Sequence, residues 1–168
     1  MAIIIAGFAG IGKSELLNMK QFNHLKINDS IDFKFSWKFN QNQDIVKNKE
    51  FPNNYIEYIL DEAERYDIIL TSTESIILDA IIQSTQCNIV FGKPYLVYPM
   101  PDEKDTYIKR YEKYKSGSDF IEYMAWSWDD LIDELEYKDG CNRYILSEGE
   151  YLSDMIENSL LKSNTLFK

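Results

Sequence analysis

Residues 7–14 read Gly-Phe-Ala-Gly-Ile-Gly-Lys-Ser and fit the pattern G-x-x-x-x-G-K-[ST] at every specified position. They follow a short apolar run over residues 2–6 and precede a segment over residues 14–21 that we expect to be helical. A strand, a glycine-rich loop and a helix in this order are the context in which the pattern binds phosphate. The stretch therefore predicts an α/β fold built around a phosphate-binding loop.

Each residue type in this loop has its own task. Glycine lets the backbone turn so that successive N–H groups point at an anion, and the start of the following helix adds unpaired donors and partial positive charge. Lys13 is placed to reach the β- and γ-phosphates of a nucleotide, and the Ser14 hydroxyl to bind Mg²⁺. The predicted nucleotide-binding residues are Gly7, Phe8, Ala9, Gly10, Ile11, Gly12, Lys13, Ser14 and Glu15.

Composition and length narrow the remaining options. The chain has 168 residues and a formal net charge of −10. This length suits one domain with its own core, and the acidity argues against nucleic acid or an anionic membrane as partner. The sequence allows a homodimer.

Two further observations bear on the cellular compartment. Cys87 and Cys141 offer no metal-ligand spacing and are expected to be reduced thiols. The apolar run at residues 2–6 is too short for a signal peptide, and no stretch reaches membrane-spanning length. We therefore expect a cytoplasmic protein.

Short apolar runs and amphipathic segments alternate along the chain. Strands are expected at residues 2–6, 24–27, 66–71, 94–99 and 142–146. Helices are expected at residues 14–21, 55–63, 77–82, 102–115, 121–135 and 151–161. Ser118 is the expected N-cap of the helix at 121–135. This order predicts βαβ units, and so a three-layer α/β/α domain with a mainly parallel sheet of about five strands.

The segment after the second predicted strand has a different pattern. Residues 31–39 alternate between apolar and polar side chains, which predicts a strand or an extended segment with one covered face. The polar residues 40–50 are expected to form a loop or a weak helix. The alternating aromatic side chains have two interpretations, stacking on a nucleobase or packing this segment onto the domain: Phe33, Phe35, Trp37 and Phe39.

Two common classes of phosphate-loop protein lack their signatures here. The guanine-binding tetrapeptide N-K-x-D of GTPases is absent from the sequence. Motor-type ATPases carry an acidic residue at the end of a central strand, but here Asp67 lies at the start of the strand over 66–71 and Glu74 comes three residues after its end. Because open α/β sheets bind ligands at the carboxyl ends of their strands, this placement disfavours a standard ATPase.

The chain resembles P-loop nucleotide kinases, in particular small nucleoside-monophosphate-kinase-like proteins of phages and low-GC Gram-positive bacteria. The resemblance covers most of the chain and is carried by residues 7–14, the Asp29-Ser30 pair, and residues 52–56, 66–70 and 107–111. It implies a single kinase-like domain over residues 1–168, with an acceptor-binding insert at about 30–53 and a basic lid at about 102–120.

The resemblance also implies a function, ATP-dependent phosphoryl transfer to a nucleotide or nucleoside. Lys13 and the loop amides would hold the β- and γ-phosphates of ATP, and Ser14 would help to hold Mg²⁺. Arg110, with Lys113 or Lys115, would close over the transferring phosphoryl group. Such transfer depends more on positioning and charge neutralisation than on covalent chemistry.

A shortage of arginines keeps other functions open. Nucleoside monophosphate kinases supply several arginines, whereas this chain has only Arg65, Arg110 and Arg143. A kinase of a neutral nucleoside or small metabolite would need a general base, for which Asp29 or Asp32 is well placed, although Asp29 equally suits a turn-capping role. A nucleotide-binding regulatory protein without turnover and an NTPase with a non-standard acid are further alternatives.

Overall fold

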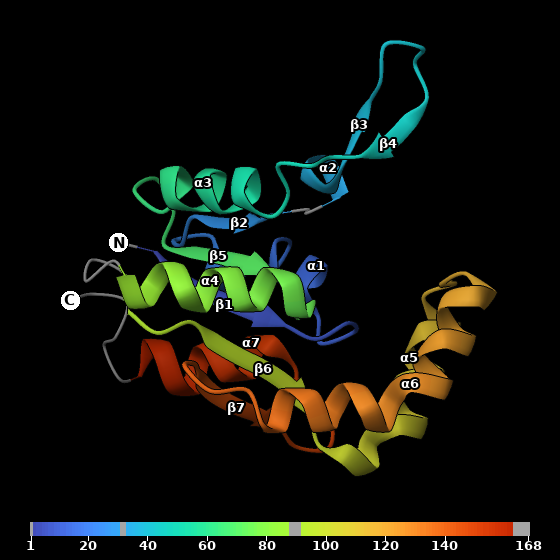
Figure 1. Cartoon of the computed structure of the whole chain (residues 1–168). Helices are drawn as coiled ribbons and strands as arrows, with labels where there is room; N and C mark the ends of the chain where they lie inside the picture. Colours follow the sequence, from blue (N-terminus) through green and yellow to red (C-terminus); the bar gives the residue numbers. More distant parts are fainter. Residues whose placement is uncertain (1, 31–32, 88–91, 163–168) are drawn as a thin grey trace.

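The strand that leads into the loop at residue 7 lies at the centre of the sheet. The computed structural model describes residues 2–30, 33–87 and 92–162. Its main sheet has five strands in the order β2-β5-β1-β6-β7, and every neighbouring pair is parallel. The predicted α/β class and mainly parallel five-stranded sheet are therefore confirmed (Figure 1).

The elements have the following bounds. The strands are β1 (Ile3–Gly7), β2 (Ile27–Asp29), β3 (Trp37–Phe39), β4 (Ile45–Lys47), β5 (Ile68–Thr71), β6 (Tyr95–Pro99) and β7 (Asn142–Leu146). The helices are α1 (Lys13–Leu16), α2 (Phe33–Ser36), α3 (Asn53–Glu62), α4 (Ser75–Cys87), α5 (Lys104–Lys113), α6 (Ser118–Glu136) and α7 (Leu152–Met155). Single 3₁₀ turns occupy Lys20–Phe22 and Pro101–Glu103, and a π-helical segment, Ile156–Leu161, continues α7.

Helices cover both faces of the sheet because its central strands are apolar on both sides. Ile4 of β1 and Ile69 of β5 belong to one buried cluster with residues of α3 and α4. Ile5, the neighbour of Ile4 in β1, belongs to a second cluster that includes residues of α1, α6 and α7. Successive strand residues point to opposite faces, so this alternation fixes a layer of helices on each side.

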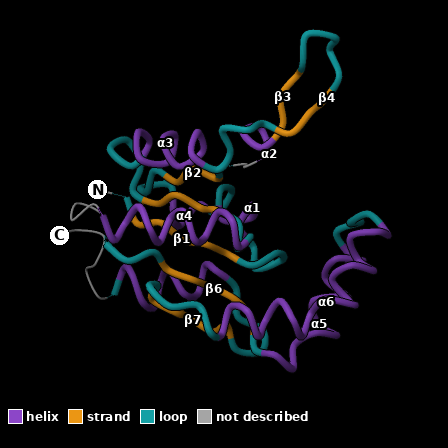
Figure 2. The backbone as a smooth tube through the Cα atoms, in the orientation of Figure 1, coloured by secondary structure: helices purple, strands orange, loops and turns teal. Residues whose placement is uncertain are grey.

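Two parts of the chain project from the end of the sheet at which the strands finish (Figures 1 and 2). One is the two-stranded antiparallel hairpin β3–β4, and the other is the pair of helices α5 and α6. The first lies in the predicted insert and the second in and beyond the predicted lid. Both flank the edge of the sheet where parallel α/β proteins bind ligands.

The structure corrects the predictions for the insert. Residues 33–36 form a helical turn instead of a strand, and Phe35 packs on Tyr55 and Tyr58 of α3 with ring centroids 5.2 and 4.9 Å apart. Residues 45–47 form a strand in place of the predicted loop or helix. The hairpin is closed by Asn40, whose side-chain oxygen accepts two backbone N–H bonds at 2.9 Å, a turn that asparagine favours.

Two helix predictions also need correction. The first helix ends at Leu16 instead of residue 21, because the amides of Asn18 and Met19 bond in tight turns to Glu15 and Leu16 and the backbone of Met19 is extended. The helix predicted to be capped by Ser118 begins at that residue, with Gly117 as its N-cap. The last helix and the strand at 142–146 lie where they are predicted.

Some predictions concern residues outside the described ranges. These residues include Ile31 and Asp32, and Asp32 is one of the two candidate bases. Cys141 is a free thiol, as predicted. In the three described ranges, no helix combines the length and hydrophobicity of a membrane span.

Candidate functional site

The predicted phosphate loop connects β1 to α1 at a topological switch point. The chain leaves β1 toward β2 on one side of the sheet, while it leaves β6 toward β7 on the other. Open α/β sheets bind ligands where neighbouring connections diverge in this way. Gly10 and Gly12 have φ angles of 79° and 95°, a region that glycine adopts easily. The loop therefore has the position and backbone conformation that an anion site needs.

Neighbouring elements hold the loop at both ends. The amide of Phe8 donates to the carbonyl of Val97 in β6, and the amide of Leu152 donates to the carbonyl of Ile11, both at 2.9 Å. The Ile11 side chain is fully buried. Since α1 is a single turn, its dipole is small, and the loop amides themselves are the main donors available to an anion.

Lys13 turns back over the loop from the first residue of α1. Its ammonium group donates to the carbonyl oxygens of Gly7 and Phe8, the latter at 3.0 Å. Two pockets lie next to this side chain, and Lys13, Ala9 and Phe120 line both of them. The lysine is thus the point where the contents of the two pockets would meet.

Helix α5 packs directly on the loop. The Tyr111 hydroxyl donates to the carbonyl of Ala9 at 3.0 Å, and Nη1 of Arg110 donates to the carbonyl of Gly10 at 3.4 Å. A Cβ atom on Gly10 would lie 2.7 Å from Cε1 of Tyr111. The predicted lid segment therefore supports the predicted phosphate loop in this conformation.

Arg110 is held between aromatic rings. Its guanidinium carbon lies 4.4 Å from the ring centre of Tyr107 and 4.2 Å from that of Tyr151, and the residue is only 8% exposed. Planar stacking of this kind suits arginine and not lysine. Lys113 and Lys115, its predicted partners, lie exposed at the end of the helix. Among the three predicted lid cations, Arg110 is the one that the structure brings to the loop.

The first pocket, of about 470 Å³, lies beside the second half of the loop. We call it the aromatic pocket. Loop residues form one side and flat rings the other: Gly10, Gly12, Ser14, Glu15, Tyr111, Tyr114, Phe120 and Tyr151. Backbone donors next to aromatic rings are suited to a phosphate chain attached to a nucleobase.

The second pocket, of about 510 Å³, lies between the start of the loop, the segment after β5, and α6. We call it the β5 pocket. Its polar lining consists of Lys13, Ser72, Thr73, Glu74, Ser75 and Glu134. Besides Glu134, helix α6 contributes side chains that are apolar except for the hydroxyl group of Tyr123. These residues are Phe120, Tyr123, Met124, Leu131 and Leu135.

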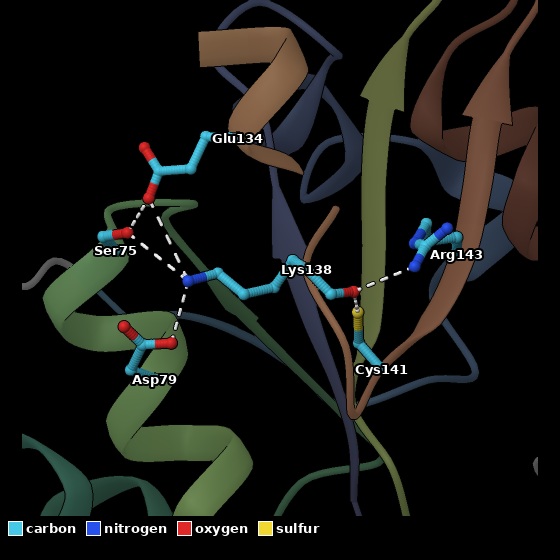
Figure 3. Close-up of polar contacts among 6 residues, drawn as sticks. All are labelled: Ser75, Asp79, Glu134, Lys138, Cys141 and Arg143. Atoms are coloured by element: carbon cyan, nitrogen blue, oxygen red, sulfur yellow. Dashed lines mark hydrogen bonds and ion pairs between the residues drawn. The ribbon is translucent and has the colours of Figure 1, made fainter. Parts of the chain in front are cut away.

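Two lining residues of the β5 pocket, Ser75 and Glu134, belong to a polar cluster with Asp79 and Lys138 (Figure 3). The Ser75 hydroxyl at the start of α4 donates to Oε1 of Glu134 in α6. Nζ of Lys138 lies 2.8 Å from Oδ1 of Asp79 and 4.0 Å from Oε1 of Glu134. These contacts fix α6 against α4 and hold the Glu134 carboxylate at the pocket edge.

The predicted base Asp29 ends β2, two strands away from β1. Burial raises the pKa of its carboxyl, while the positive charge of Lys13 acts in the opposite direction. The neighbouring Ser30 has a structural part, because its hydroxyl bonds to the Tyr55 hydroxyl at 2.5 Å and donates to the carbonyl of Leu70 at 3.0 Å. Asp29 thus shares the electrostatic environment of Lys13 at the same edge of the sheet.

Glu74 is the site residue that sequence reasoning undervalues. Its distance of three residues from the strand end disfavours it in the sequence, yet it lines the β5 pocket together with Lys13. The pairing of β5 beside β1 brings the two segments together. The sequence shows the acidic residue but not this long-range pairing, and without the pairing Glu74 cannot be assigned to the site.

The other two arginines lie outside both pockets. Arg65 pairs with Glu62 at 2.9 Å and its side chain is 72% exposed. Arg143 lies near the start of β7, at the opposite end of the sheet, and donates to the carbonyl of Lys138 at 3.1 Å. In the described part of the chain, Arg110 is therefore the only arginine at the loop.

No model of a known protein family matches the sequence. A search of curated proteins also gives no match.

Proposed function

We propose that this protein is a phosphotransferase that carries the γ-phosphoryl group of ATP to a nucleotide or nucleoside, as a P-loop kinase does. The observation that carries the proposal is the pair of pockets that meet at Lys13. A transferase needs adjoining sites for donor and acceptor, whereas simple hydrolysis needs only the first.

The aromatic pocket is the donor site in this proposal. The phosphates would lie against the loop amides, and the base among the rings of Tyr114, Phe120 and Tyr151. Lys13 would turn from its carbonyl partners to the β- and γ-phosphates, where its charge offsets the charge of the transferring group. Arg110 would act through the loop and α5, which it holds in place.

The residues present are compatible with Mg²⁺ bound together with the nucleotide. Ser14 is exposed and lines the aromatic pocket beside Glu15. No group of three or more histidine, cysteine or acidic side chains gathers into a metal site in the described ranges, but Mg²⁺ with a nucleotide takes most of its ligands from phosphate and water. When bound there, the ion would neutralise charge on the β- and γ-phosphates.

The experiment is an ADP-release assay with ATP, Mg²⁺ and a panel of nucleosides and nucleoside monophosphates, with products identified by mass. We expect release that depends on the acceptor. Lys13→Ala should lower kcat by roughly 10²- to 10³-fold, while the exposed Lys93→Ala serves as the matched control without effect. Release that ignores the acceptor would instead indicate an NTPase, and tight ATP binding without turnover a regulatory protein.

A further inference from the structure

The charges that line the β5 pocket constrain its ligand. Two carboxylates, Glu74 and Glu134, line it, and Lys13 is the only cation of its lining within the described part of the chain. In the proposed function Lys13 binds the donor phosphates and is not available to a second phosphate group. Apart from Lys13, the charged side chains in the described lining of this pocket are therefore carboxylates.

Two cations near the pocket already have protein partners. Nζ of Lys138, which does not line the pocket, lies 2.8 Å from Oδ1 of Asp79 and 4.0 Å from Oε1 of Glu134 (Figure 3). Arg110 lies across the loop, between the rings of Tyr107 and Tyr151. A phosphate monoester carries up to two negative charges near neutral pH and is bound in proteins by arginine and lysine clusters. Such a cluster is missing from the described lining of this pocket.

We propose that the acceptor is a hydroxyl compound without a phosphate group, neutral or cationic and with a flat apolar body, which is the chemistry of a nucleoside and not of its monophosphate. This inference rests on the proposed function. The body would lie against Phe120, Met124 and Leu131, all of which line the pocket. Hydroxyl or amino groups would donate to the Glu134 carboxylate, which the Ser75 hydroxyl already orients.

Glu74 is placed to accept the acceptor's proton, because it lines the same pocket as Lys13 and follows the strand next to β1. In the transfer step the acceptor oxygen forms a bond to the γ-phosphorus of ATP. The bond from that phosphorus to the β–γ bridging oxygen breaks, and its electron pair leaves with ADP. The hydroxyl proton passes to the Glu74 carboxylate and then to solvent.

Binding in the presence of a non-hydrolysable ATP analogue and Mg²⁺ tests the charge argument directly. Calorimetry compares each nucleoside with its own 5′-monophosphate, so that the pair differs only in the phosphate. We expect the wild-type protein to bind at least one nucleoside on the order of tenfold or more tighter than its monophosphate, since the phosphate would lie beside the carboxylates of the lining and like charges repel. Glu74→Gln should reduce this preference, and the exposed Asp130→Asn should leave it unchanged.

Kinetics test the role of Glu74. With the nucleoside that binds, Glu74→Gln should lower kcat on the order of a hundredfold and leave the KM for ATP unchanged, whereas Glu64→Gln, an exposed carboxylate on another element, should not change kcat. Tighter binding of the monophosphate, or no binding of either class, would overturn the inference. Failure of the ATP analogue to bind would instead contradict the proposed function.

Discussion

Gly10 is the residue at which the predicted phosphate loop packs most closely on helix α5. Its φ of 79° is strained for any other residue, and an added Cβ would meet the buried ring of Tyr111 at 2.7 Å. Gly149 offers a matched comparison, because its φ is 77° and an added Cβ there would meet no atom within 4 Å. The two positions therefore differ in packing and not in backbone conformation.

We predict that Gly10→Ala lowers the free energy of unfolding by roughly 2–5 kcal/mol, the backbone cost plus that of overpacking. Gly149→Ala should cost only the backbone part, about 1–2 kcal/mol. Urea unfolding of both variants measures the difference. Equal losses would show that α5 does not press on the loop in solution.

For Arg110, the contribution to stability and the predicted role in phosphoryl transfer can be measured separately. The guanidinium is buried between two rings and bonded to the loop carbonyl of Gly10. We predict that Arg110→Lys lowers the free energy of unfolding by roughly 2 kcal/mol, because an ammonium cannot stack on both rings. The exposed Lys113→Ala should change it by less than about 0.5 kcal/mol.

The same variants distinguish two roles for Arg110 in transfer. If it positions the loop, Arg110→Lys should raise the KM for ATP more than it lowers kcat. A fall in kcat at constant KM would instead show that Arg110 contacts the transferring phosphoryl group, as the family resemblance implies.

At the scale of elements, Phe35 fixes the insert to the body of the protein. It packs on Tyr55 and Tyr58, and its carbonyl accepts bonds from the side chains of Asn48 and Asn54 at 3.0 and 3.1 Å. Phe39, in the same insert, is 72% exposed. One aromatic residue thus carries the packing while the other faces solvent.

We predict that Phe35→Ala lowers the free energy of unfolding by roughly 2 kcal/mol, less than for a fully buried phenylalanine. Amide hydrogen exchange over residues 33–47 should become faster while β1 and β5 keep their protection. Phe39→Ala should leave both measurements nearly unchanged. Faster exchange throughout the sheet in Phe35→Ala would show that the insert is part of the folding core instead.

The secondary structure of the insert could not be predicted correctly from the sequence. The period-two pattern at residues 31–39 predicts one strand, but it arises from a helical turn that packs on α3 followed by a strand of the hairpin. A strand such as β5 is predictable because its apolar run reflects burial in the sheet. The helical turn depends on the packing of Phe35 on Tyr55 and Tyr58, and residues 45–47 form a strand by pairing with residues 37–39; the polar–apolar pattern shows neither contact.

The same distinction applies to the site. The loop at residues 7–14 is visible in the sequence because its signature is local, with fixed spacing and glycines where φ is positive. The β5 pocket depends on the pairing of β5 with β1 and on the placement of α6. Neither contact has a short-range signature, so the role proposed for Glu74 requires the fold.

On the scale of the whole molecule, an aromatic cluster connects the loop to the projecting helices. Phe8 contacts Tyr107 and Trp128 with ring centroids 6.3 and 5.4 Å apart, and Tyr107 contacts Tyr111 at 6.3 Å. Burial raises the pKa of Tyr107 to about 12, with the charge of Arg110 acting in the opposite direction. Burial raises the pKa of Tyr111 as well. Both phenols are therefore neutral in the folded protein at pH values where free tyrosine ionises.

This shift predicts how stability depends on pH. Above about pH 10 the unfolded chain releases phenolic protons that the folded chain retains, so the unfolded state binds fewer protons and stability falls as pH rises. The loss should extend from about pH 10 to the folded pKa of about 12, at up to roughly 1.4 kcal/mol per pH unit for Tyr107. Below pH 10 this contribution is constant.

We predict that Tyr107→Phe makes the fall in unfolding free energy between pH 10 and 12 less steep, because one buried ionisation is removed. Tyr137→Phe is the control, since the Tyr137 side chain is 82% exposed. Urea unfolding at a series of pH values gives the slopes. If the unfolding free energies of wild type and Tyr107→Phe fall equally steeply with pH, water enters the aromatic cluster between the loop and α5. The packing behind the proposed donor site would then not exclude water.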